Sequence, residues 1–513
     1  MSLWVPKRLS GESIKITPMP NVNGKRWARR SIWILVRWQN YTPHRACKAR
    51  RKPADIEGAF LSLISNYHRL RFPPFPCGFR STCVVERNAQ SDEELLDRLQ
   101  RAAFDYFLQQ INPANGLVAD TTRKDAPISI AVVGFALASY PVGVERGWIA
   151  RTEAATRTLT TLRFFSNSRQ GEEPDATGFK GFYYHFLDPQ SGKRVWQSEL
   201  SLIDTVLLLA GMLTARAYFT ENTQSEAEIR DLADALYRRT DWQWAQNGKS
   251  AVSHGWKPEC GFLHYGWEGY NEATILYVLG LASPTFPLPD KSFLAWTMTY
   301  QWENLYGYDF LYAGPLFVHQ FSHAWIDFRG IRDRFMREKR SDYFENSRRA
   351  TYVQQEYAKR NPHGFEDYGE NCWGFTACDG PGAETLRVHG RDRRVLGYTA
   401  RGVPYGPDDG TIAPWAALAS LPFAPQISLS AVRHFCEQYP EIARAYRLPS
   451  GFNPTLAGKS PHGWVSEGYF GLDQGIIVLM IENYRSQLIW KLMRQCSYIR
   501  AGLQRAGFRG GWL

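Results

Sequence analysis

The polar and apolar positions of this 513-residue chain alternate between two kinds of predicted helix from residue 91 onwards. Helices of the first kind are apolar on nearly every side, which is typical of a helix buried on all faces. Helices of the second kind carry one apolar stripe and one polar face, which is typical of a helix that covers a core. The first of these begins with a predicted capping box formed by Ser91 and Glu94.

The two kinds of segment follow each other in a regular order along the chain. The apolar segments are 127–140, 201–217, 273–281, 315–326, 412–421 and 473–482. The amphipathic segments are 92–110, 151–165, 224–244, 290–302, 342–359 and 429–437, with 485–498 as a further partner. Six inner helices alternating with six outer ones predict an all-α (α/α)6 toroid, a double ring of inner and outer helices with long rim loops.

Strand-like segments are few and short. Patches at 179–186 and 195–197, joined by a turn at 188–192, predict a small β-hairpin on one rim. In a double ring of helices, the loops at one end of the inner ring build the binding cleft. We therefore expect functional residues where loops enter the inner helices.

The charge distribution divides the chain into two parts. Residues 1–90 hold 17 Lys and Arg against 4 Asp and Glu, whereas residues 91–513 hold 44 against 46. The near-neutral second part, expected to be the catalytic domain, gives no support for nucleic-acid binding. For the basic extension 1–90 the sequence leaves three interpretations open: a poorly ordered extension, a segment that is not native coding sequence, or a tail that binds nucleic acid or an anionic membrane.

Targeting and membrane segments are not evident in the sequence. The apolar run 32–36 is shorter than a secretory signal requires, and no small-residue cleavage site follows it. No apolar run reaches the roughly 18–20 residues that a transmembrane helix needs. The eight cysteines form no CxxC pair and no zinc-site spacing, and a disulfide such as Cys372–Cys378 is compatible with the sequence but not required by it.

Aromatic residues are abundant and concentrate around one acidic residue. The chain has 18 Trp, 26 Tyr and 29 Phe, and flat aromatic faces suit stacking on sugar rings. In the stretch 255–277 a loop rich in glycine and aromatics leads into an apolar helix, with Glu272 at the junction. A structural alternative is that a carboxylate simply favours the positive end of the helix dipole. The substrate-binding candidates of this stretch are Trp256, Trp267, Tyr270 and Asn271.

A second junction carries two more carboxylates. Glu199 and Asp204 can both border the cavity if their helix starts near Ser201. An aspartate inside an apolar helix is costly unless it is hydrogen-bonded, which makes Asp204 a catalytic candidate. A buried structural carboxylate bonded to the neighbouring backbone is the alternative.

Two further regions supply polar candidates for sugar contacts. The first comprises His319, Gln320, His323, Asp327 and Arg329. Its two histidines lie four residues apart, but without an H-E-x-x-H arrangement they do not predict a metal site, and an ion pair of Arg329 with a buried aspartate is the structural alternative. The second comprises Trp373, Asp379 and Asp409, in a glycine- and proline-rich rim or lid where Asp-Gly pairs could equally be turn formers.

Glycosidic cleavage needs one protonated carboxylic acid at the leaving oxygen and a second carboxylate that acts on water or on the sugar. A carboxyl group stays protonated near neutral pH when it is desolvated or lies near a like charge. Glu272 can be desolvated at the junction of the aromatic loop and the apolar helix, and Asp204 could supply the nearby like charge. No nucleophile elbow, phosphate-binding loop or dinucleotide fingerprint competes with this interpretation.

Several motifs resemble the bacterial glycoamylase-like family, which includes the endo-β-1,2-glucanases of glycoside hydrolase family 144 and is similar to a central domain of cyclic β-1,2-glucan synthases. The motifs span residues 92–513 in order and include NPANGLVAD (112–120), IDTVLLLAG (203–211), YNEATILY (270–277), LYAGPLF (311–317), HAWIDFRGI (323–331), DYFENS (342–347), DGTIAP (409–414) and the segment 475–492. The resemblance implies an (α/α)6 barrel that acts on β-1,2-glucan without metal or cofactor, and it places Asp204 and Glu272 among the acidic residues expected to matter. It also implies a periplasmic or secreted location, which the absence of a convincing signal peptide does not support.

We therefore expect a monomeric glycoside hydrolase with Glu272 as general acid, Asp204 as positioning group or second carboxylate, and Glu199 in reserve. Two alternatives stay open at this point. One is an exo-acting β-glucosidase or transglycosylase on short β-linked gluco-oligosaccharides. The other is a non-catalytic toroid that binds glycans.

Overall fold

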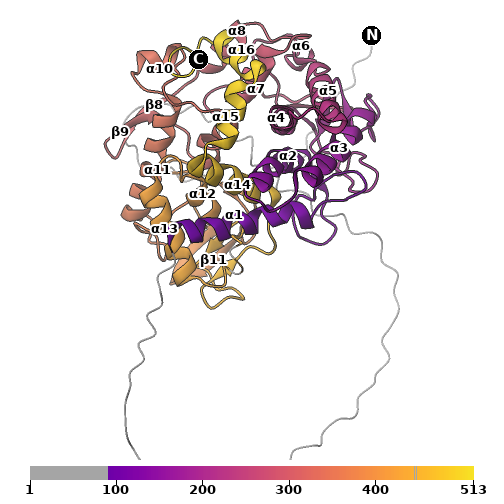
Figure 1. Ribbon diagram of the computed structural model, residues 1–513. Coiled ribbons are helices and arrows are strands. Elements are labelled where there is room, and N and C mark those ends of the chain that lie inside the picture. The colour runs from indigo at the N-terminus through magenta and orange to yellow at the C-terminus, as the bar shows by residue number, and fades with distance from the viewer. Residues whose placement is uncertain (1–90, 444, 446) are drawn as a thin grey trace, which may run out of the picture.

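The computed structural model describes residues 91–443, 445 and 447–513, and these form a mostly helical structure with several small sheets (Figure 1). The interpretations of residues 1–90 therefore lie outside the described residues. Within the described part, no helix combines the length and the apolar character that crossing a membrane requires. The five cysteines described there are free thiols, Cys372 and Cys378 included.

Helices that are buried on nearly all sides occur at the six predicted apolar segments. They are α2 (Ile130–Glu145), α4 (Leu202–Tyr218), α7 (Thr274–Ala282), α9 (Phe321–Trp325), α12 (Pro414–Ala419) and α14 (Gly471–Arg485). The segment predicted as one helix at 315–326 is instead a 3₁₀ turn, η2 (Leu316–His319), followed by the short α9. Gln320, between them, has its backbone N–H bonded to Phe317 rather than to a residue four positions earlier.

The remaining helices fall mostly in the predicted amphipathic segments, except α10, which lies in none of them, and α16, which begins at the end of the last one. They are α1 (Asp92–Gln109), α3 (Arg151–Asn167), α5 (Gln224–Arg238), α6 (Trp242–Ala245), α8 (Lys291–Thr297), α10 (Arg334–Glu338), α11 (Tyr343–Arg360), α13 (Pro425–Gln438), α15 (Leu488–Gln495) and α16 (Ser497–Arg505). The capping box is confirmed, because Ser91 accepts a hydrogen bond from the backbone of Glu94 and Glu94 accepts one from the backbone of Ser91. The predicted helix 224–244 is divided into α5 and α6, and the one at 290–302 ends at Thr297.

The buried helices contact one another in a closed cycle. Helix α2 packs on α4, α4 on α7, α12 on α14, and α14 on α2. Ser322 of α9 accepts a hydrogen bond from the backbone of Ile275 in α7 at 3.1 Å. The amide of Gln320, at the start of α9, donates to the carbonyl of Ala416 in α12 at 2.8 Å. The cycle α2–α4–α7–α9–α12–α14 therefore returns to its first helix.

The contact between α2 and α4 is a contact of backbones. A Cβ atom added to Gly211 would lie 2.1 Å from the carbonyl oxygen of Gly134, and one added to Gly134 would lie 2.3 Å from that of Leu207. Both distances are far below van der Waals contact, so only glycine fits at these two positions.

The last helix covers the helix that follows Glu272. Helix α16 packs along α7, and Gly502 allows a similarly close approach to the carbonyl of Val278. Arg505 donates hydrogen bonds to the carbonyl oxygens of Leu281, in the last turn of α7, and of Leu288, six residues beyond its end.

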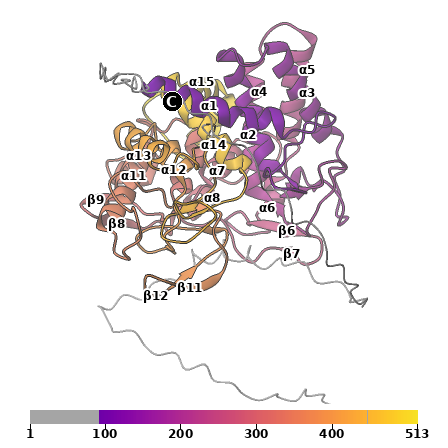
Figure 2. The same cartoon turned by 90° about the horizontal axis from the view of Figure 1, so that it is seen from below.

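The strands are short. They are β1 (Ile128–Ser129), β2 (Gly178–Phe179), β3 (Phe182–Tyr184), β4 (Phe186–Leu187), β5 (Leu200–Ser201), β6 (Gly255–Lys257), β7 (Gly261–Phe262), β8 (Trp302–Leu305), β9 (Tyr308–Leu311), β10 (Ala377–Cys378), β11 (Glu384–Val388), β12 (Arg391–Val395), β13 (Thr399–Ala400), β14 (Phe452–Asn453) and β15 (Trp464–Val465). The largest sheet is antiparallel with the order β2-β3-β5-β6-β7. Figure 2 shows β6, β7, β11 and β12 along one edge of the molecule and α1 and α15 along the opposite edge.

The predicted rim hairpin is present in part: across the turn at 188–192, Leu187 bridges Arg194 and Val195 donates its backbone N–H to the carbonyl of Phe186 at 3.1 Å. The strand β3 pairs with β5 and β4 pairs with β1, whereas 195–197 is not a strand. This segment lies in a tight turn in which Ser198 donates its backbone N–H to the carbonyl of Val195 at 3.0 Å.

Candidate active site

Glu272 lies directly before α7, in the turn that leads into the helix. Asn271 shapes this turn, because its side-chain oxygen accepts the backbone N–H of Ala273 at 3.0 Å. Ser322 of the neighbouring α9 donates to the carbonyl of Glu272 at 2.7 Å. The backbone of Glu272 is thus fixed from two sides, and its side chain keeps partial exposure to solvent.

A second group of acidic side chains surrounds a histidine at the start of α4. The Nδ1 atom of His185 lies 3.0 Å from a carboxylate oxygen of Glu199 and 3.2 Å from one of Asp204. Sheet pairing brings the first two together, because the backbone N–H of His185 donates to the carbonyl of Glu199. Ser201, the N-cap residue of α4, accepts the backbone N–H of Asp204 and donates its hydroxyl to the same carboxylate at 2.5 Å.

The environment raises the pKa of one carboxyl group and lowers that of another. Burial raises the pKa of Glu272 to about 7, and the charge of Asp204 acts in the same direction. Burial also acts to raise the pKa of Glu199, but the hydrogen bond and charge of His185 outweigh it and hold this pKa below its ordinary value. Two carboxyl groups near neutral pH therefore differ in protonation, which is how general acids and carboxylate partners are separated in active sites.

His185 is the cation of the group. Burial alone would lower its pKa, but the charges of Asp204 and Glu199 and the hydrogen bond of Glu199 raise it to about 9. The imidazole is then protonated at neutral pH, with a carboxylate on either side of Nδ1. His185 was not predicted from the sequence, since a lone histidine in a strand-like patch carries no recognisable pattern.

Two further aspartates belong to the same end of the helices and were also not selected. Burial raises the pKa of Asp120 to about 6, and the charge of Asp204 adds to this effect. Burial raises the pKa of Asp473 well above its ordinary value, with the charges of Asp120 and Asp379 acting in the same direction. Asp473 stands in the first turn of α14, as Asp204 does in α4, and this shared position was the signal available in the sequence.

The predicted aromatic platforms differ in how accessible they are. Trp256 is half-buried, with its ring 5.2 Å from that of Phe179. Tyr270 is also half-buried, with rings of Tyr343 and His319 at 5.7 and 5.2 Å. The two remaining candidates are buried: Trp267 stacks on His254, and Trp373 has no exposed surface.

The polar candidates around α9 lie inside the protein. His319 binds the carbonyl of Ala313 through Nε2 at 3.1 Å, and His323 binds the hydroxyl of Ser347 at 3.0 Å. Burial lowers the pKa of His319 to about 4 and that of His323 to about 3, so both rings are neutral. Gln320 is fully buried against α12.

Asp327 and Arg329 lie at the other end of the helices. Asp327 is buried and accepts two hydrogen bonds of 2.8 Å from Arg329, and it also pairs with Arg494. Arg329 further donates to Gln487, which follows the C-terminal end of α14, whereas Asp473 stands at its N-terminal end. A 15-residue helix is about 22 Å long. The structural alternative, an ion pair of Arg329 with a buried aspartate, is what the structure contains.

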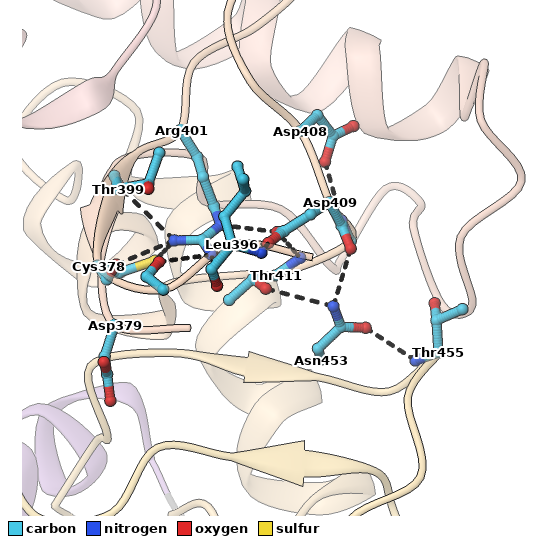
Figure 3. A network of polar contacts seen from close by, with 12 residues as sticks. Cys378, Asp379, Leu396, Thr399, Arg401, Asp408, Asp409, Thr411, Asn453 and Thr455 are labelled. Atoms are coloured by element: carbon cyan, nitrogen blue, oxygen red, sulfur yellow. Dashed lines mark hydrogen bonds and ion pairs between the residues drawn. The ribbon is translucent and has the colours of Figure 1, made fainter. Parts of the chain in front are cut away.

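Asp409 is the centre of a buried network. Its carboxylate binds Arg401 at 2.7 and 2.8 Å and accepts the backbone N–H groups of Leu396 and Thr411 (Figure 3). Neither side chain of the Arg401–Asp409 pair is accessible to solvent to any useful extent. The network fastens the segment between β10 and α12.

Asp379 lies near this network but belongs to a different contact. Figure 3 shows its carboxylate directed away from Arg401. The carboxylate pairs with Arg123 and accepts the hydroxyl of Ser466 at 2.7 Å. It also acts electrostatically on Asp473, which connects it to the acidic group described above.

None of the sequence candidates belongs to a group of potential metal ligands in the described part of the chain. The one such group found there is Asp367, Cys372 and His434. In it the histidine and the carboxylate are already hydrogen-bonded to each other at 2.6 Å.

The group formed by Asp120, His185, Glu199, Asp204, Glu272 and Asp473 is called the carboxyl cluster below. It lies at the N-terminal ends of α2, α4, α7 and α14, where loops and short strands enter the buried helices. It offers three carboxyl groups with raised pKa values (Asp120, Glu272 and Asp473), one with a lowered pKa (Glu199), and the cation of His185.

Comparison with known proteins finds a consistent set of relatives. Residues 264–497 match the family model Glycoamylase, described as "Putative glucoamylase". A solved structure of the same description from Bacteroides uniformis has a TM-score of 0.74 and 31% identity, covering 83% of this chain and 99% of that one. The endo-β-1,2-glucanase from Chitinophaga pinensis, solved with sophorotriose and glucose, has a TM-score of 0.71 and 27% identity, covering 83% and 100%.

A further relative is the exo-β-1,2-glucooligosaccharide sophorohydrolase (non-reducing end) from Parabacteroides distasonis. It is 29% identical over 451 residues, which are 81% of this chain. The match spans 58% of the length of that relative.

Proposed function

The chain belongs to the glycoamylase family, and from this premise we propose that it is a glycoside hydrolase that cleaves β-1,2-linked glucan at the carboxyl cluster. Glu272 is the general acid that protonates the leaving glycosidic oxygen. The observation that carries this assignment is the pKa of Glu272, raised to about 7 by burial at the mouth of α7. A carboxyl group with such a pKa can both donate a proton near neutral pH and accept one back.

Asp204 is proposed as the second carboxylate, with Glu199 as the alternative. In hydrolysis this group either accepts a proton from the attacking water or bonds to the sugar directly. His185 contacts both candidates, because its Nδ1 atom lies 3.0 Å from Glu199 and 3.2 Å from Asp204. In both routes Glu272 gives a proton to the leaving oxygen. In the first route the second carboxylate takes a proton from the attacking water; in the second route Glu272, now ionised, takes it from the water that breaks the bond between the carboxylate and the sugar.

The substrate class is supported by the names of two relatives. The Chitinophaga protein is an endo-β-1,2-glucanase and the Parabacteroides protein a sophorohydrolase, so both act on β-1,2-linked glucose chains. The partly exposed Trp256, Tyr270 and Asn271 are proposed as sugar contacts. The buried candidates Trp267, Gln320 and Trp373 are proposed not to contact sugar and to act only by supporting the residues that do.

The fold of the catalytic part is proposed to be an (α/α)6 toroid. The closed cycle of six buried helices supports the inner ring, and the amphipathic helices α1, α3, α5, α8, α11 and α13 provide the outer one. In this arrangement the carboxyl cluster stands at the N-terminal ends of the inner helices, where their dipoles favour negative charge on the ionised members.

The test is hydrolysis of long, linear β-1,2-glucan by the wild type and by Glu272→Gln. We expect the wild type to release reducing sugar and the variant to lose at least about 1,000-fold in kcat, since general acid catalysis and its coupled steps are removed. Near-normal activity of the variant would end the assignment of Glu272. Glycan binding by a wild type that releases no reducing sugar would favour a non-catalytic toroid.

The products distinguish the two kinds of relative. A mixture of oligosaccharide lengths early in the reaction indicates endo cleavage, as in the Chitinophaga protein. Sophorose as the single early product indicates exo cleavage, as in the Parabacteroides protein, and products longer than the substrate indicate transglycosylation.

A further inference from the structure

Trp196 is the one tryptophan among residues 91–443, 445 and 447–513 that is mainly exposed, at 57% of its surface. Exposing an indole ring to water is unfavourable, because a tryptophan buries a large apolar area when it packs. The exposed position of this ring therefore calls for a functional or structural reason.

The ring lies next to the carboxyl cluster. Its centroid is 5.2 Å from that of Phe186, and the ring of Phe186 stacks on His185 at 4.1 Å with an interplanar angle of 15°. His185 in turn contacts Glu199 and Asp204. Two ring spacings thus separate the exposed indole from the histidine at the centre of the acidic group.

The backbone that carries the ring is strained. Trp196 has φ +57° and the following Gln197 has φ +48°, both in the left-handed region. With the hydrogen bond from Ser198 to Val195, these two residues are the central pair of a β-turn with positive φ at both positions, as type I′ turns have. Asparagine and glycine are favoured at such positions, whereas other residues pay a steric penalty.

An ion pair between the buried Arg194 and the exposed Glu259 fixes this turn. The guanidinium of Arg194 donates to the carbonyl of Ser198 at 2.6 Å and binds both carboxylate oxygens of Glu259 at 2.6 and 3.0 Å. It also lies over the ring of Tyr184, 4.7 Å from its centroid. The arginine side chain is 1% exposed, so the turn is anchored from inside the protein while its tip faces solvent.

We infer that Trp196 is a sugar-stacking platform at the edge of the carboxyl cluster, binding the apolar face of a glucose ring in the glucan chain beyond the bonds being cleaved. Strained residues that the surrounding structure holds in place gather at ligand sites, and an indole face is suited to the C–H surface of a pyranose. The ligand class rests on the proposed function, since the chain is expected to bind β-1,2-linked glucose.

The first experiment compares Trp196→Ala with the wild type on long β-1,2-glucan and on the shortest oligosaccharide that is cleaved. We expect KM for the long substrate to rise about 3- to 10-fold, as one aromatic stacking contact is lost. The kcat values and the KM for the short substrate should stay within about twofold of the wild type. The KM of Trp196→Phe for long glucan should lie between those of the wild type and Trp196→Ala. Tyr484→Ala is the matched control, because Tyr484 is also an exposed aromatic (40%) but stands at the C-terminal end of α14.

The second experiment uses the favoured turn sequence, Trp196→Asn combined with Gln197→Gly. We expect its Tm to rise by about 1–3 °C, since the turn strain is relieved, while KM for long glucan rises as in Trp196→Ala. A lower Tm would overturn the inference, because Trp196 would then serve the stability of the turn.

Binding separates this inference from the proposed function. Oligosaccharides of increasing length are titrated by calorimetry into Glu272→Gln with and without Trp196→Ala. Equal affinities with and without the indole at every length overturn the platform, whatever the activity of the wild type. Weaker binding of long chains by Trp196→Ala supports the platform even if the wild type hydrolyses nothing, in which case the proposed function fails alone. If neither protein binds β-1,2-glucan, both fall.

Discussion

Glu272 and Glu199 are chemically alike but stand in opposite environments. Burial and the negative charge of Asp204 both raise the pKa of Glu272. The protonated ring of His185 outweighs the effect of burial on Glu199 and lowers the pKa of that group. The difference arises from single contacts, so single substitutions should change it.

Removing the charge of Asp204 should move the pH dependence of catalysis. The charge of Asp204 raises the pKa of Glu272, so Asp204→Asn should lower it. Activity requires the protonated acid, so the alkaline limb of the kcat/KM profile, expected near pH 7 in the wild type, should shift to lower pH. The residual activity of Asp204→Asn from pH 4 to 9 checks this. Asp379→Asn is the control, since its charge is not among those that act on Glu272, and an unshifted limb in Asp204→Asn would contradict the coupling.

Ionisation of Glu272 should also lower the free energy of unfolding at high pH. Its folded pKa of about 7 is raised above the ordinary value of 4.5, so the protonated form is favoured in the folded state. The contribution is fully present below about pH 4.5 and is lost as pH rises through 7. Glu272→Gln, which cannot ionise, should therefore exceed the wild type in free energy of unfolding by about 1–3 kcal/mol at pH 8.

At pH 4 the same two proteins should unfold at nearly the same denaturant concentration. Urea titrations at both pH values measure the difference directly. A difference independent of pH would mean that the pKa of Glu272 is not raised in the folded protein.

At the scale of elements, the crossing of α2 and α4 sets how closely the inner helices approach. Gly211→Ala should destabilise the protein by about 1–3 kcal/mol, because its Cβ would lie 2.1 Å from the carbonyl oxygen of Gly134. In an uncrowded helix the same change would stabilise by about 1 kcal/mol, so even the sign is diagnostic.

Gly369→Ala is a suitable control for this crossing, since the nearest heavy atom to the added Cβ is 3.7 Å away. The free energy of unfolding in urea and the Tm are the measurements. Stabilisation by Gly211→Ala would show that the two helices are further apart than described.

The buried helices were predictable because an apolar face on every side leaves one solution, full burial. The ends of these helices were less predictable. In the segment 315–326, for example, a 3₁₀ turn replaces the first part of the helix. The pairing of short strands was not predictable, because two-residue strands carry no alternation from which to read a register. That pairing is what brings His185 to Glu199, so the histidine was missed with it.

The exposure of the aromatic residues was likewise not predictable from the sequence. Abundance of tryptophan favours sugar binding, but the sequence does not separate Trp373, which is fully buried, from Trp196, which is exposed. Only the strained turn distinguishes Trp196, and a left-handed φ at a non-glycine residue leaves no mark in the sequence. Likewise Asp409 was a candidate as part of an Asp-Gly pair, and its buried partner Arg401 was not recognised.

At the scale of the whole molecule, acidic residues from segments far apart in sequence share one end of a cycle of helices. Asp120, Glu272 and Asp473 precede or begin different helices, yet the charge of Asp204 reaches the first two and that of Asp120 reaches the third. An arrangement of this kind holds its groups through helix packing rather than through direct bonds between them. The turn that carries Glu272 is part of this arrangement, because Asn271 and Ser322 fix its backbone.

The cover of α7 by α16 has a consequence for how the protein is made. Arg505 bonds to the carbonyl of Leu281, a partner synthesised 224 residues earlier. At about 5–20 residues per second, a ribosome needs roughly 10–45 s to add that length of chain. Throughout this interval the apolar helix behind Glu272 lacks its final neighbour and is open to chaperones or to other nascent chains. The proposed general acid, Glu272, is thus encoded in the middle of the chain, but the packing behind it is completed late.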